Sequence, residues 1–173
     1  MIKKDAFSSP WEGYFENNDI HDCGDAGMQL VHSEAELKQN EIYDCGYGLL
    51  FTTISTLDLS HSSYPQAKGY NVITGSDTYE FYGDYCNDCY WGRNSDETGY
   101  NSIYGTWEYG YLGNNTFVRA EDTWWDDATG VDEDDFVLEG GSSIDCDPYL
   151  EEEPGLPKRA AASLEQTQST DVD

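Results

Sequence analysis

The sequence predicts a mainly β protein, and two features lead to that prediction. Aromatic residues concentrate between Tyr70 and Asp127, a stretch that contains nine of the 14 tyrosines and four of the 5 tryptophans. Within it, short β-branched and aromatic runs alternate with Gly, Asn and Asp, as in strands separated by turns. We therefore expect a single-domain antiparallel sandwich or barrel-like meander with one short helix and extended N- and C-terminal arms.

Length and composition are compatible with one folded core. The chain has 173 residues, of which 38% are hydrophobic and 14% aromatic, and each buried aromatic ring removes about 150–250 Å² from water. Changes in composition predict three regions: an N-terminal arm over 1–29, a β-rich domain over 30–139 and a polar, acidic C-terminal tail over 140–173. No internal repeat of fixed period is visible.

The charge balance excludes one class of partner. Thirty-five Asp and Glu face 8 Lys and Arg, which leaves a net charge of −27. Nucleic acids need cations to neutralise their phosphates, so direct DNA or RNA binding is not expected. A basic protein partner, bound metal cations or a saline environment would accommodate this field, and an acidic surface that serves solubility alone is the simpler interpretation.

The sequence shows no membrane-spanning segment, no export signal and no disulfide framework, and these absences lead to expectations about the location of the protein and the redox state of its cysteines. No apolar run approaches the roughly 18 residues that span a bilayer, so no membrane association is expected. Met1–Lys4 begins like a signal peptide, but polar residues follow where an apolar segment is required. We expect a virion or cytoplasmic location. The 5 cysteines are an odd, scattered set, which favours reduced thiols over a disulfide framework.

The only helix predicted lies at about Glu34–Asn40. Ser33 and Glu36 have the spacing of a capping box, in which each side chain accepts a hydrogen bond from the other residue's backbone N–H. After it, Ile42–Leu59 is predicted to be a strand covered on both faces, since its centre is apolar and uncharged.

Further strands are expected along the aromatic stretch and just after it. Gly75–Asp77 and Gly113–Asn115 are predicted hairpin turns, because Gly and Asn tolerate positive φ. Alternation predicts a core face that contains Ile103, Trp107, Tyr109 and Tyr111. The expected strands are Tyr70–Thr74, Thr78–Tyr82, Tyr85–Trp91, Ser102–Leu112, Thr116–Ala120 and, at an edge, Phe136–Leu138.

Two groups of residues are candidate metal ligands. Cys86 and Cys89 have the CxxC spacing of a zinc-binding pair, but no second pair completes a site, so packed thiols are the simpler interpretation. Asp132 and Asp134 are candidate calcium ligands in an acidic segment that lacks the EF-hand pattern. No cofactor is expected.

The sequence identifies no reaction. His21, His32 and His61 lie near no catalytic motif, although carboxylate pairs for glycoside hydrolysis could occur among so many acids. We predict a non-enzymatic structural or interaction subunit of a larger assembly, most plausibly a virion (capsid, tail or decoration) protein. Its partners would be other subunits or a basic protein surface. The predicted partner-binding residues are Trp11, Glu121, Asp122, Trp124, Trp125, Asp126, Asp127, Asp132, Glu133, Asp134 and Asp135.

Two other interpretations account for the acidity. The first is an acidic nucleic-acid mimic that inhibits a DNA- or RNA-binding enzyme, because carboxylates along an edge can occupy phosphate sites. It depends on the segment Ala120–Pro157, which contains no Lys or Arg. The second is adaptation to high salt, which needs no partner.

Overall fold

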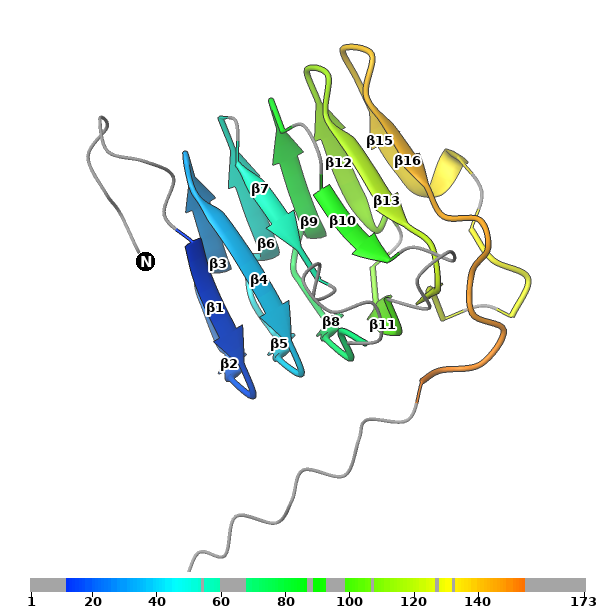
Figure 1. Ribbon diagram of the computed structural model, residues 1–173, viewed down its shortest axis with the longest axis horizontal. Coiled ribbons are helices and arrows are strands. Elements are labelled where there is room, and N and C mark those ends of the chain that lie inside the picture. The colour runs from blue at the N-terminus through cyan, green and yellow to red at the C-terminus, as the bar shows by residue number, and fades with distance from the viewer. Residues whose placement is uncertain are drawn as a thin grey trace, which may run out of the picture.

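The computed structural model describes residues 12–53, 55–59, 68–86, 89–92, 99–106, 108–126, 128–131 and 133–154. Over these residues the chain winds into a stack of coils, and each complete coil contributes one strand to each of three sheets (Figure 1). Every strand pair among the described residues is parallel. The architecture is therefore a parallel β-solenoid.

The three sheets run the length of the stack. We call them A, B and C, in the order in which each coil visits them. Sheet A consists of β1 (Glu12–Glu16), β4 (Glu34–Lys38), β7 (Thr56–Asp58), β10 (Cys89–Gly92), β13 (Phe117–Ala120) and β16 (Ser143–Asp145). Sheet B consists of β2 (Asp19–His21), β5 (Glu41–Tyr43), β8 (Val72–Thr74), β11 (Asn101–Tyr104) and β14 (Thr123–Trp124). Sheet C consists of β3 (Ala26–Val31), β6 (Tyr47–Thr52), β9 (Tyr79–Asp84), β12 (Gly110–Gly113) and β15 (Phe136–Leu138), with the 3₁₀-helix η2 (Glu133–Asp135) just before β15.

The antiparallel sandwich or meander predicted from the sequence is wrong. Consecutive strands belong to different sheets, and each strand pairs with its equivalent one coil away. The predicted hairpin turns are corners between sheets: Gly75, with φ of 68°, turns the chain from B to C, and Asn114, with φ of 49°, turns it from C to A. Positive φ was predicted correctly there, but a solenoid corner requires it as much as a hairpin does.

The predicted helix is also wrong. Residues Glu34–Lys38 form β4, in which Ala35 and Leu37 are 3% and 1% exposed while their neighbours are half-buried. This is the two-residue alternation of a strand with one covered face. Tertiary burial therefore overrides the capping box.

Several boundaries need correction. The predicted N-terminal arm contains the first coil, β1 to β3, and β16 lies inside the predicted tail. Strands were predicted correctly where β8, β9, β13 and β15 lie. The single strand predicted over Ile42–Leu59 is divided among three sheets, as β5, β6 and β7, and the one over Ser102–Leu112 is divided into β11 and β12.

The core is a set of inward-facing columns along the stack. In sheet C, Met28, Leu49 and Phe81 occupy one register position on successive coils, and Leu49 and Phe81 are 1% and 0% exposed. Phe81 packs edge-on against Trp91 of sheet A, with ring centroids 4.6 Å apart. Each coil thus buries its apolar residues against those of the next coil as well as across the interior.

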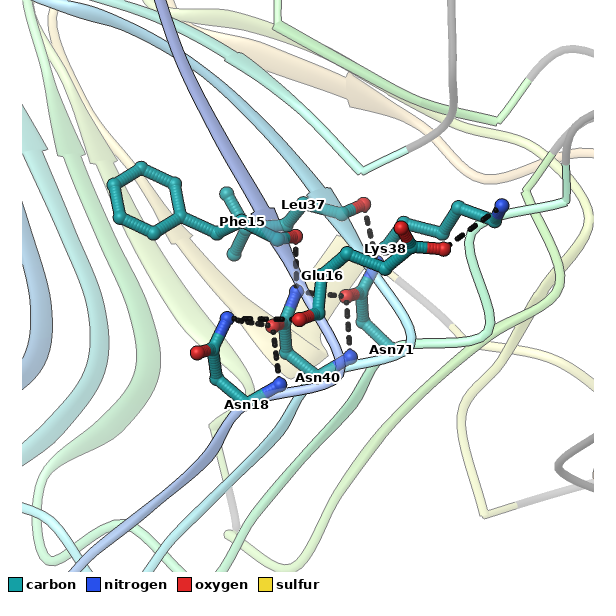
Figure 2. A network of polar contacts seen from close by, with 7 residues as sticks. All are labelled: Phe15, Glu16, Asn18, Leu37, Lys38, Asn40 and Asn71. Atoms are coloured by element: carbon teal, nitrogen blue, oxygen red, sulfur yellow. Dashed lines mark hydrogen bonds and ion pairs between the residues drawn. The ribbon is translucent and has the colours of Figure 1, made fainter. Parts of the chain in front are cut away.

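Asparagines line the corner between sheets A and B (Figure 2). The side chain of Asn18 donates to Asn40 Oδ1 at 2.8 Å, Asn40 donates to Asn71 Oδ1 at 3.0 Å, and Asn71 donates to Asn101 Oδ1 at 2.9 Å. We call these four residues the asparagine ladder. An amide both donates and accepts, so one residue type can be stacked on every coil without adding charge.

The ladder also pairs backbone groups of the corner. Asn40 Nδ2 donates to Phe15 O and Asn71 Nδ2 to Leu37 O, each at 2.9 Å. Among the described residues the ladder ends at Asn101, because its register partner on the next coil is Thr123. The buried Oγ1 of Thr123 has no hydrogen-bond partner.

Replacing Asn71 with Ala tests the contribution of the ladder to stability. Asn71 is 0% exposed, and its loss removes the acceptor of the buried Asn40 N–H and the amide that donates to Leu37 O and Leu59 O. Because each such group costs roughly 1–3 kcal/mol, we expect Asn71→Ala to lower the free energy of unfolding by at least about 3 kcal/mol in urea titrations. Asn18→Ala, at the half-buried start of the ladder, should cost clearly less, and equal losses would contradict this account.

Candidate functional site

The outer face of sheet C carries a continuous aromatic surface. Tyr82 and Tyr111 are register partners on β9 and β12, and Tyr47 and Tyr79 are register partners on β6 and β9. All four side chains are half-buried, whereas Phe81, between Tyr79 and Tyr82 in sequence, is fully buried. Alternation places Tyr82 opposite Phe81, but it is interrupted at Glu80 and Phe81, which are both buried and whose backbone N–H groups both donate to Tyr109 O. Tyr79 therefore reaches the outer face although it lies two residues from Phe81, as its ring contact with Tyr111 shows. We call these four residues the tyrosine surface.

The rings of the tyrosine surface contact one another. Tyr82 and Tyr111 stack with centroids 4.6 Å apart and an interplanar angle of 13°. Tyr47 meets Tyr82 edge-on at 5.9 Å, and Tyr79 lies tilted against Tyr111 at 6.3 Å. Such pairs gain energy beyond the area they bury, and they hold each ring in one orientation. The surface is thus pre-organised by stacking along the solenoid.

Carboxylates border the tyrosine surface. Tyr111 Oη donates to Glu139 Oε2 at 2.8 Å, and this hydrogen bond, followed by burial, raises the pKa of Tyr111 to about 12. Burial and the nearby Glu108 carboxylate raise the pKa of Tyr79, and burial and Asp84 raise that of Tyr82. The phenols therefore stay protonated and neutral, while the rim is anionic.

The strands of sheet C contain no Lys or Arg. The cationic side chains that the structure does describe belong to sheet A or the corner after it: Lys38 pairs with Glu16 at 3.1 Å, Lys68 lies 3.5 Å over the Tyr100 ring, and the Arg119 guanidinium carbon lies 5.9 Å from the centre of the Tyr90 ring. Aromatic faces and carboxylates both attract cations. The tyrosine surface is therefore suited to a partner that presents Arg or Lys.

The acidic segment predicted to bind a partner winds around the last coil. Glu121 and Asp122 lie at the corner after β13, Asp126 follows β14, and Asp134 and Asp135 lie in η2 before β15. These acids thus face different sides of the solenoid. Trp11, Asp127 and Asp132 lie outside the described residues, and of Glu133 only the backbone is described.

The two tryptophans of that segment differ. Trp124 is half-buried, whereas Trp125 is 0% exposed and packs edge-on against Phe136 with ring centroids 5.4 Å apart. The prediction that Trp125 binds a partner needs correction, because this residue, just after β14, lies in the core against Phe81 and Phe136.

The predicted metal ligands have different surroundings. Cys86 and Cys89 are 0% and 1% exposed, and the Cys86 thiol donates to Phe51 O at 3.4 Å. A hydrogen bond from Cys89 lowers the pKa of Cys86. Asp134 is exposed, and its predicted companion Asp132 is not described. Within the described part of the chain, no three His, Cys, Asp or Glu side chains form a group that could hold a metal ion.

Sequence reasoning missed the tyrosine surface. It assigned Tyr111 to the core with Ile103 and Tyr109; Ile103 is fully buried and Tyr109 packs against the core, but Tyr111 faces outward. Trp107 lies outside the described residues. The sequence did contain a chemical signal. The aromatic residues that face outward are tyrosines, which have a polar hydroxyl, whereas the buried aromatic residue next to Tyr82 is Phe81, which has none.

One carboxylate is enclosed in the solenoid. Glu80 is 0% exposed, its Oε2 accepts from Ser76 Oγ at 2.7 Å and its Oε1 accepts from Ser76 N at 3.3 Å. Burial raises the pKa of Glu80 to about 7, against the opposing effect of these hydrogen bonds. Because both oxygens are engaged and shielded, we assign Glu80 to the structure of the corner and not to catalysis.

The raised pKa of Glu80 makes stability depend on pH. Folding favours the protonated form, so the contribution of this group is complete below about pH 4.5 and is lost as pH rises through about 7. Glu80→Gln keeps the hydrogen-bonding shape without the charge. We expect this variant to be more stable than the parent at pH 8, by up to about 3 kcal/mol, and equally stable near pH 4.5, as measured by denaturant titration at several pH values.

The control for this comparison is Glu152→Gln, which removes one exposed carboxylate from the same highly charged chain. If both substitutions shift the pH profile equally, net charge and not the burial of Glu80 sets the dependence.

The fold agrees with a comparison with known protein families. Residues 12–86 match the family model of a right-handed β-helix region. That stretch comprises the first three coils, from β1 to β9, and the same three parallel sheets continue through the later coils. No curated protein and no solved structure matches the chain. No helix within the described residues has the length and apolar character needed to cross a bilayer.

Proposed function

We propose that this protein is a non-enzymatic structural or interaction subunit of a larger assembly, such as a virion, and that it binds a basic protein surface through the tyrosine surface. The observation that supports this best is the combination on sheet C of four contacting outward rings with the carboxylates of Asp84, Glu108 and Glu139. Protein interfaces are enriched in Tyr at their centres and have polar rims.

The charge of the chain favours a partner of opposite sign. Two copies at −27 repel each other, whereas a basic surface is attracted over distances set by the Debye length. Arg side chains are particularly suitable, because a guanidinium can stack on a Tyr ring while it donates to a neighbouring carboxylate. The geometry thus favours a heterologous partner over self-association.

Nucleic-acid mimicry is the alternative, and the placement of acids supports it less. A mimic needs anions at regular intervals along an axis. One register column of sheet A contains, coil by coil, Tyr14, Glu36, Asp58, Tyr90, Arg119 and Asp145, and one of sheet B contains Asp19, Glu41, Val72, Ser102 and Trp124; Asp58 and Ser102 are buried. Neither column has more than two successive acids.

The tyrosine surface can be tested with an Arg-rich peptide as the partner probe. We expect Tyr82→Ala and Tyr111→Ala to weaken peptide binding about tenfold each, because a stacked cation on a Tyr face contributes roughly 0.5–2 kcal/mol and the neighbouring ring loses its support. Isothermal titration calorimetry at several salt concentrations measures the loss. Net charge is unchanged, so the long-range attraction stays constant.

The matched control is Tyr14→Ala, which removes a tyrosine that is 51% exposed on sheet A. It should bind the peptide as the parent does. Equal weakening by all three substitutions would contradict the proposed surface. Tighter binding of a neutral oligosaccharide than of the peptide would contradict the proposed partner. Displacement of DNA from a DNA-binding enzyme, with no dependence on Tyr82, would favour mimicry.

A further inference from the structure

Two cysteines occupy neighbouring coils at the same corner. Cys23 follows β2 and Cys45 follows β5, and the last residues of these strands, His21 and Tyr43, are register partners. Each thiol donates to the carbonyl two residues earlier, Cys23 to His21 O at 3.5 Å and Cys45 to Tyr43 O at 3.3 Å. Equivalent thiols with equivalent acceptors lie one above the other, one coil apart.

The backbones are also adjacent at this point. Gly46 N donates to Cys23 O at 3.0 Å, so the interstrand hydrogen bonding continues past the ends of β2 and β5. Neighbouring strands lie about 4.7–4.9 Å apart, and the Cα atoms of a disulfide are usually about 4.4–6.8 Å apart. The corner therefore presents both cysteines at a separation that a disulfide can bridge.

We propose that Cys23 and Cys45 form an inter-coil disulfide when the protein meets a peroxide. Cys23 is half-buried and reachable, whereas Cys45 is 1% exposed. The Cys23 sulfur attacks one oxygen of hydrogen peroxide, the O–O bond breaks, and water and a Cys23 sulfenic acid result. The Cys45 sulfur then attacks the Cys23 sulfur and the S–O bond breaks. The hydroxide that leaves takes up the Cys45 thiol proton and is released as a second water.

The other cysteines are less suited to this reaction. Cys86 and Cys89 are buried, so peroxide does not reach them in the folded chain. Burial raises the pKa of Cys146, which keeps it in the unreactive thiol form. Burial also raises the pKa of Cys45 to about 11, and a hydrogen bond with Cys23 contributes. Cys23 is therefore the first thiol to react, and Cys45 is the one that resolves it.

The bond would join the first coil covalently to the second. It closes the loop from Cys23 to Cys45 and so restricts the unfolded chain. The first coil has a neighbouring coil on one side only among the described residues, so it gains most from a covalent link. Peroxide treatment should raise the melting temperature by several degrees.

The test is peroxide treatment of the full chain, followed by alkylation and non-reducing peptide mapping. The expected product is one Cys23–Cys45 peptide pair, two hydrogens lighter than the two separate peptides. Dithiothreitol should reverse both the cross-link and the rise in melting temperature. In Cys45→Ser, dimedone should instead trap the sulfenic acid at Cys23.

A second readout needs no variant. Dibromobimane becomes fluorescent when it bridges two neighbouring thiols. Once one end has reacted with the half-buried Cys23, the reagent is held beside Cys45, and in the untreated protein it should link the two. Recovery of Cys23 as sulfinic acid, or linkage of Cys86 to Cys89 with Cys23 still free, would overturn the proposal. So would a bimane bridge at any other pair.

Discussion

The stacking of each coil on the next is the constraint on which the rest of this structure depends. Every strand takes its backbone partners from the coils before and after it, so a residue that faces inward on one coil must fit over its equivalent on the next. At the corner between sheets A and B this requirement is polar, because carbonyls such as Phe15 O and Leu37 O point into the interior. Asparagine meets it on four coils, since the amide satisfies the corner and its neighbouring amides at once.

The same register organises the exterior. Outward residues also form columns, and in sheet C two of these, Tyr47 with Tyr79 and Tyr82 with Tyr111, bring the rings of the tyrosine surface together. Its acids lie at or next to strand ends: Asp84 ends β9, Glu108 precedes β12 and Glu139 follows β15. A surface assembled from distant segments is therefore a direct consequence of the repeat. The net charge makes this face attractive to cations and unfavourable for a second copy.

The sequence predicted the β content and several strands because β-branched and aromatic runs report burial on a pleated surface. It did not predict parallel pairing, because one residue with positive φ turns a solenoid corner as well as a hairpin. The period was hidden as well. The register partners Tyr14, Glu36 and Asp58 are 22 residues apart, but the next steps, to Tyr90, Arg119 and Asp145, are 32, 29 and 26.

The candidate site was harder to predict than the strands. Its tyrosines belong to three different coils and become neighbours only through the parallel register. The acids that the structure describes between Glu121 and Glu139 are dispersed around the last coil, so the density of acids in the sequence does not correspond to a patch among these residues. Trp125 illustrates the same difficulty, because one step along a strand exchanges a partner-facing position for a core position.

Hydroxyl-radical footprinting, with and without an Arg-rich peptide, tests the central claim most directly, because it reports the solvent exposure of individual tyrosine side chains. Tyr14 and Tyr85, which are 51% and 53% exposed and lie outside the tyrosine surface, serve as internal references. The account predicts that the peptide protects Tyr47, Tyr79, Tyr82 and Tyr111 and leaves the two references unchanged. Protection of Tyr14, or uniform protection around the solenoid, would contradict it.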